Sequence, residues 1–67
     1  MNQNDQNALS QNWDQAKEQI KSQFGVTDDD VATGQTSPDQ LSDVLANKTG
    51  QDRNEVEKQL SSIAQSL

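Results

Sequence analysis

Residues 9–25 constrain the fold most strongly, because their apolar side chains recur at the spacing of a helix. Successive apolar positions are separated by four, three, four and four residues: Leu9, Trp13, Ala16, Ile20 and Phe24. At about 100° per residue, these side chains fall within roughly 80° of one another and form one stripe along about four helical turns. The pattern predicts an amphipathic helix that begins near Ser10, ends at Gly25 and is covered by the rest of the chain.

The other end of the chain repeats this geometry. Within residues 52–67, apolar side chains follow steps of four, three and four residues: Val56, Leu60, Ile63 and Leu67. Asp52 and Glu55 have the spacing of a capping box, which predicts where this helix begins. The first and last stripes are therefore expected to enclose a common core.

Two shorter helices are predicted between these stripes. Thr27 and Asp30 form another capping box, and Gly34 is expected to end a helix of about two turns. Ser37 as the N-cap and Pro38 as the first helical residue begin the next helix, which is expected to continue to the following glycine. The local start and stop signals agree with the apolar pattern.

We therefore predict an all-α fold, a small four-helix domain of residues 9–67 arranged as two crossed helical hairpins. Residues 1–8, MNQNDQNA, show no periodicity and are predicted to be a disordered Asn/Gln-rich tail. The expected core consists of Leu9, Trp13, Ala16, Ile20, Phe24, Val31, Leu41, Val44, Leu45, Val56, Leu60 and Ile63.

Composition taken alone favours a different outcome. Only 28% of the residues are apolar, whereas globular domains have about 45–50% with glycine included. A low apolar content is typical of disorder, so one alternative is a chain that is largely unfolded alone and orders on binding. The placement of the apolar residues favours the folded domain, because nearly every large one lies on a helical stripe.

The chain is acidic, with 11 acidic and 5 basic residues and a formal net charge of −6. Direct nucleic-acid binding is not expected, because phosphates attract Lys/Arg clusters that this sequence lacks. Aspartates in the middle of the chain could instead bind a basic protein site or mimic a nucleic acid: Asp28, Asp29, Asp30, Asp39 and Asp43. A solvated surface that confers solubility is the simpler interpretation.

The residue types on which most enzymes depend are missing. Histidine, cysteine and tyrosine are absent, and a core this small offers little volume in which to desolvate a carboxylate or lysine. We therefore expect no catalytic residues, no cofactor and no enzymatic activity. A calcium site of the EF-hand type is not expected either, because Ala32 and Thr33 stand where a loop beginning at Asp28 needs an oxygen ligand and a glycine. Trp13 could serve as a stacking platform for a base, but its place in the stripe favours the core.

The sequence also allows predictions of the protein's cellular location and oligomeric state. No apolar run approaches the roughly 18 residues of a membrane span, and residues 1–7 do not have the pattern of a signal peptide. We expect a cytoplasmic protein that is a monomer, has no membrane contact and has at most a protein partner of unknown identity.

The order of several short motifs resembles the CsbD-like family of small bacterial stress proteins. These motifs are N-W-D-x-x-K, K-x-x-F-G, T-D-D-D followed by an aliphatic residue, a glycine three residues later, D-Q-L, and G-x-x-x-x-E-x-E-K. The matching residues are Asn12, Trp13, Asp14, Lys17, Lys21, Phe24, Gly25, residues 27–31, Gly34, residues 39–41, Gly50, Glu55, Glu57 and Lys58. The similarity spans residues 10–64. It departs from the family pattern at Glu18 and Asp43, where glycine is usual, and at Thr49, where tyrosine is usual.

The resemblance implies a physiological setting but does not imply a biochemical mechanism. Proteins of this family are short, acidic, all-helical and abundant under general stress, and their biochemical activity is undefined. The resemblance therefore implies a non-enzymatic bacterial stress-response protein that acts as a hydrated acidic protectant or as an interaction module. It supplies no catalytic or binding residues that could be transferred to this chain.

Overall fold

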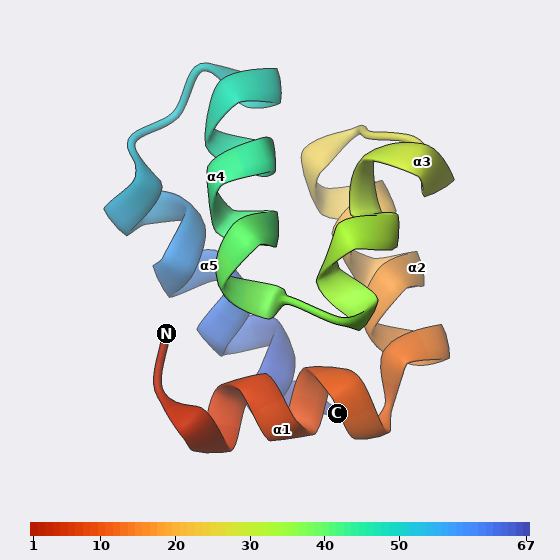
Figure 1. Ribbon diagram of the computed structural model, residues 1–67. Coiled ribbons are helices and arrows are strands. Elements are labelled where there is room, and N and C mark those ends of the chain that lie inside the picture. Colours follow the sequence, from red (N-terminus) through yellow and green to blue (C-terminus); the bar gives the residue numbers. More distant parts are fainter.

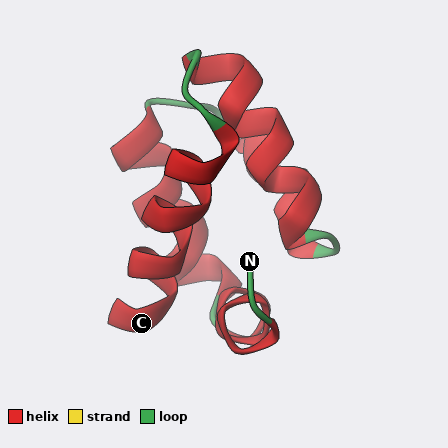
Figure 2. Cartoon of the chain, turned by 90° about the vertical axis from the view of Figure 1, so that its left-hand side faces the viewer, coloured by secondary structure: helices red, strands yellow, loops and turns green.

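A computed structural model describes residues 1–67 and shows an all-helical protein without strands (Figure 1). The elements are α1 (Gln3–Gln11), α2 (Trp13–Phe24), α3 (Asp28–Val31), the 3-10 helix η1 (Ala32–Gln35), α4 (Pro38–Thr49) and α5 (Arg53–Ser66). In Figure 1, α4 and α5 run in opposite directions, and α1 lies across one end of the molecule. Figure 2 views α1 along its axis and shows that it crosses the longer helices at a steep angle.

The prediction of a disordered tail at residues 1–8 is wrong, because most of these residues belong to α1. The helix begins with a side-chain cap, in which Asn2 Oδ1 accepts a hydrogen bond from the backbone N–H of Asp5 at 2.8 Å. It is also anchored to the remainder of the molecule, because Asp5 and Leu9 are both buried. The capping bond and the buried side chains order a segment whose composition alone is typical of disorder.

The single helix expected over residues 10–25 is instead two helices that meet at Asn12. At this residue φ is −119° and ψ is 40°, so the chain turns sharply between α1 and α2. The Asn12 side chain donates a hydrogen bond to the carbonyl oxygen of Ala8 at 3.3 Å. A short amide side chain of this kind can hydrogen-bond the local backbone and thereby compete with helix continuation. Leu9 consequently lies on α1 and Trp13 opens α2, although both side chains enter the same core.

The later helix boundaries follow the sequence signals with three exceptions, of which the first is Ser37, which precedes α4 but makes no capping hydrogen bond with its side chain. The capping box of Thr27 and Asp30 is present at the start of α3. Asp52 precedes α5 but makes no capping hydrogen bond with its side chain. Gly34 does not end a helix, because it lies inside η1 and is buried. A Cβ atom at Gly34 would lie 2.5 Å from Leu41 Cδ2 and 2.8 Å from Trp13 Cη2, so the glycine allows the backbone to approach the core.

The core lies where α1, α2, α4 and α5 converge, with Val31 of α3 added to it. The buried apolar residues are Leu9, Trp13, Ala16, Ile20, Val31, Leu41, Leu45, Val56, Leu60, Ile63 and Ala64. Ala64 was not among the expected core residues. Two expected members, Phe24 and Val44, are only half-buried. Phe24 still packs against the core at the end of α2, whereas Val44 lies roughly 110° around α4 from the centre of its buried face.

Candidate functional site

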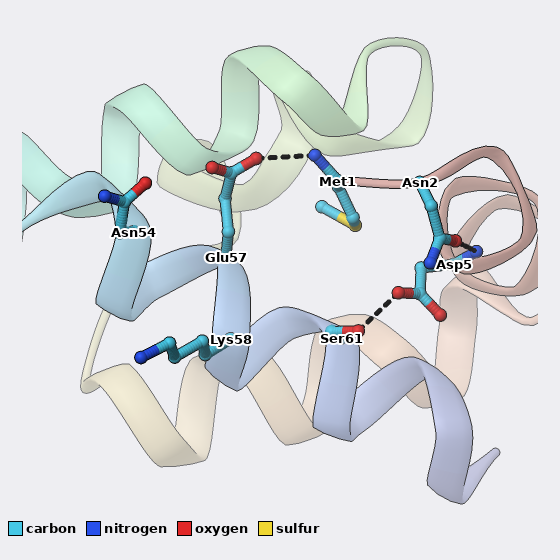
Figure 3. A pocket seen from close by; sticks show the side chains of 7 residues that line it. All are labelled: Met1, Asn2, Asp5, Asn54, Glu57, Lys58 and Ser61. Carbon is cyan, nitrogen blue, oxygen red and sulfur yellow. Dashed lines mark hydrogen bonds and ion pairs between the residues drawn. The ribbon is translucent and has the colours of Figure 1, made fainter.

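A hollow on the surface lies between the start of α1 and α5 (Figure 3). It has a volume of about 420 Å³ and is lined by Met1, Asn2, Asp5, Asn54, Glu57, Lys58 and Ser61. We call it the α1–α5 groove. Met1 is the only hydrophobic residue in its lining, so polar or charged side chains form most of the wall and could hydrogen-bond water or a small polar molecule.

The N-terminal ammonium group fastens one side of this groove. It donates a hydrogen bond to Glu57 Oε1 at 2.6 Å, and it lies 3.7 Å from Asp39 Oδ1. The hydrogen bond to Glu57 raises the pKa of the Met1 amine and lowers the pKa of the Glu57 carboxyl. Because Asp39 belongs to α4 and Glu57 to α5, one cation joins the start of α1 to two other helices.

A second polar contact fastens α1 to α5 at the other side of the groove. Asp5 is only 6% exposed, and its Oδ2 atom accepts a hydrogen bond from the Ser61 hydroxyl (Figure 3). Burying a carboxylate without a hydrogen-bond partner would be costly. The Ser61 hydroxyl therefore makes the burial of Asp5 tolerable and fixes the position of α1.

The chemistry open to the α1–α5 groove is hydrogen bonding. Its two carboxylates are already engaged, Glu57 with the terminal ammonium and Asp5 with Ser61. Lys58 lies 3.6 Å from Glu55 and is well exposed. Together with Asn54, it can donate hydrogen bonds to a small polar molecule, whereas the remaining polar groups hold the helices together.

The five aspartates expected to form an interaction surface are mostly paired within the chain. The pairs are Asp28 with Lys21 at 2.7 Å, Asp30 with Lys48 at 3.4 Å, Asp43 with Arg53 at 3.3 Å, and Asp39 with the Met1 ammonium at 3.7 Å. Asp29 has no such partner. The hydrogen bond from Lys21 lowers the pKa of Asp28. Much of the local acidic charge is thus compensated by bases that are distant in the sequence.

These aspartates also do not converge on one site. Asp30 pairs with Lys48 in the last turn of α4, whereas Asp39 lies in the first turn of the same helix. At about 1.5 Å per residue, these two positions are separated by roughly 13 Å along α4. The structure divides the predicted acidic residues between α3 and α4 and does not gather them into a single acidic pocket.

Trp13 lies in the core, and little of the residue reaches the surface. It is 8% exposed, which leaves no open aromatic face on which a base could stack. A second hollow of about 400 Å³ borders Trp13 and is otherwise lined by polar residues: Ser10, Gln11, Asn12, Asp14, Gln15 and Gln35. The stacking alternative is therefore not supported by the position of the indole.

Two further features bear on the class of site. No group of three or more His, Cys, Asp or Glu residues is close enough to hold a metal ion. None of the helices combines the length and apolar character needed to cross a bilayer. Comparison with known protein families, with curated proteins and with solved structures finds no match for this chain.

Sequence reasoning missed the residues that line the α1–α5 groove. Asp5 and Ser61 are separated by 56 positions, as are Met1 and Glu57, so neither contact leaves a periodic or local signal. One local signal was present, because Asn2 and Asp5 have the spacing of an N-cap and the third helical residue. That spacing could have predicted α1, although not the surface on which it docks.

Proposed function

We propose that this protein is a non-enzymatic, cytoplasmic stress-response protein of the bacterial CsbD-like type, acting as a hydrated protectant or interaction module. The observation that carries the proposal is the surface, on which no large hydrophobic side chain is exposed. The motif order described above, from Asn12 to Lys58, supports the family assignment and the physiological setting. The proposal does not depend on any ligand of the α1–α5 groove.

The polar surface supports a role that depends on hydration. The chain contains 11 Gln and 6 Asn residues, and few of these amides are held in the interior. Some of them hydrogen-bond one another: Gln23 of α2 donates to Gln59 of α5 at 3.0 Å, and Gln59 donates to Gln51, in the loop before α5, at 3.1 Å. Amide groups on the surface hydrogen-bond water or another protein's polar groups without presenting an apolar patch.

The same surface supports a monomer. Stable dimers usually bury an apolar core patch at their interface, and no large hydrophobic side chain is exposed here to form one. A basic protein partner is the weaker candidate. It would have to displace the internal ion pairs of Asp28, Asp30, Asp39 and Asp43.

A deletion and complementation experiment tests the proposal. Loss of the gene is expected to lower survival under at least one of salt, heat, acid or stationary-phase stress. The wild-type gene should restore survival, whereas Trp13→Ala should not, because removing a buried tryptophan costs about 3–5 kcal/mol and would unfold much of so small a domain. Unchanged survival of the deletion strain under all four stresses would contradict the proposal.

Purified protein offers a second test that needs no host. A labile enzyme dried or heated with this protein should retain more activity than the same enzyme with an equal mass of an unrelated acidic protein. Equal losses in the two samples would remove the protectant role and leave the interaction role to be tested by affinity capture from stressed cells.

A further inference from the structure

Residues 28–35, which form α3 and η1, cover one side of the core with little apolar contact of their own. We call them the α3–η1 segment. Val31 is its only large buried side chain. The backbone at Gly34 lies directly against Trp13 and Leu41. The segment therefore shields apolar groups of α2 and α4 while contributing a single apolar anchor.

Polar contacts provide much of the remaining attachment of this segment. Asp28 pairs with Lys21 of α2 at 2.7 Å, and Asp30 pairs with Lys48 of α4 at 3.4 Å. The Asp30 carboxylate also accepts a hydrogen bond from the backbone N–H of Thr27 at 3.2 Å, which completes the capping box. Two carboxylates thus join the segment to two helices and maintain its first turn.

Lysines of the neighbouring helices favour the ionised form of these two aspartates, whereas Asp29, between them in the same turn, carries a like charge. On α2, Lys17 and Lys21 face Asp28, and Glu18 contacts Lys21 at 3.7 Å. On α4, Lys48 faces Asp30, and η1 contains no titratable residue. The hydrogen bond from Lys21 lowers the pKa of Asp28, and the backbone hydrogen bond at Thr27 lowers the pKa of Asp30.

The direction of these shifts fixes the sign of the pH effect. A carboxyl group whose pKa is lowered in the folded state stabilises that state above its ordinary pKa, here 3.8. This stabilisation is lost as the pH falls through the lowered value. Acid therefore removes both ion pairs and the carboxylate arm of the capping box, but it does not alter the apolar packing of α5.

We propose that the α3–η1 segment is a strap that acid releases before the remainder of the protein unfolds, exposing Trp13 and Leu41. The different attachments of the strap and of α5 explain why the strap should open first. Val56 and Leu60 of α5 are fully buried apolar side chains, whereas the strap has one apolar anchor and charged attachments. The released state presents an apolar surface that the neutral-pH fold keeps covered, so the inference goes beyond the proposed function.

Hydrogen exchange resolved by residue tests the order of release. The amides of Val31, Thr36 and Ser37, which hydrogen-bond within or beside the strap, are compared with that of Leu60 in α5. After correction for the intrinsic pH dependence of exchange, protection of the strap amides should fall about tenfold or more between pH 6 and about pH 2.5, which lies well below the ordinary pKa of both carboxyl groups. Protection in α5 should be retained over this range, and Trp13 fluorescence should shift to longer wavelength.

Aspartate variants supply a matched comparison at neutral pH. Asp28→Asn with Asp30→Asn should open the strap at pH 6, giving about a tenfold loss of protection confined to residues 31–37. Asp29→Asn removes one carboxylate charge from the same helix without removing an ion pair, so its strap protection should change less than about twofold. A uniform loss of protection in the strap and α5, no loss at about pH 2.5, or equal effects of the paired and unpaired variants would overturn the proposal.

Discussion

Gly34 occupies a position where even a methyl group does not fit. A Cβ atom there would meet Leu41 and Trp13 at 2.5 and 2.8 Å, and both neighbours are held by the core. We expect Gly34→Ala to lower the free energy of unfolding by about 1–3 kcal/mol, as overpacking usually does. Gln35→Ala, in the same turn but exposed, should change it by less than about 0.5 kcal/mol. Urea denaturation measures both, and equal stability of the two variants would contradict the close approach.

Ser42 presents the opposite case, a polar atom enclosed without a partner. Its side chain is 0% exposed and its hydroxyl makes no hydrogen bond. Removing an unsatisfied buried group should recover its desolvation cost, so Ser42→Ala is expected to raise stability by up to about 1 kcal/mol. Ser62→Ala, at an exposed helical position, corrects for the higher helix propensity of alanine. A Ser42→Ala protein less stable than Ser62→Ala would refute this reading.

At the scale of elements, local signals predicted helices better than they predicted where the helices meet. The two stripes, one with Trp13 and Ile20 and the other with Leu60, identified core residues because burial and helical period coincide. The turn at Asn12 was missed because the four-residue spacing from Leu9 to Trp13 continues the helical apolar pattern across the bend. The α1–α5 groove was missed for another reason, since Asp5 meets Ser61 only after the whole chain has folded.

The attachment of α1 gives a prediction at this scale. Ser61→Ala leaves the Asp5 carboxylate buried without its hydrogen-bond donor, which should cost about 1–3 kcal/mol. Amide protection in α1 should fall more than protection in the interior of α5. Ser62→Ala changes the adjacent, exposed residue of the same helix and should leave α1 unaffected. If the two variants have the same stability and the same α1 exchange, the Asp5–Ser61 contact does not hold the helix.

At the scale of the whole molecule, the principal question is whether so polar a chain folds without a partner. The eleven apolar residues that converge in one core favour folding, although a domain of this size retains only modest stability. Far-UV circular dichroism in dilute buffer should show a helical spectrum, a cooperative melting transition and no dependence on protein concentration. A coil spectrum that becomes helical only with a binding partner or on drying would favour the disordered alternative.

The ion pairs that join the helices predict how the stability of the whole protein depends on pH. The raised pKa of the Met1 amine contributes stability that is fully present below its ordinary value of 8.0 and is lost as the pH rises through the raised value. The lowered pKa values of Glu57, Asp28 and Asp30 contribute stability above their ordinary values and lose it in acid. Unfolding free energy from denaturant titrations should therefore be greatest between about pH 5 and 8.

The variant Glu57→Gln tests the contribution of the terminal amine. It should flatten the decline of the unfolding free energy at alkaline pH, because the amine then keeps only the longer contact to Asp39. The decline in acid should remain, because Asp28 and Asp30 are unchanged. An alkaline limb unchanged by this substitution would show that the terminal ammonium does not join α1 to α5 in solution.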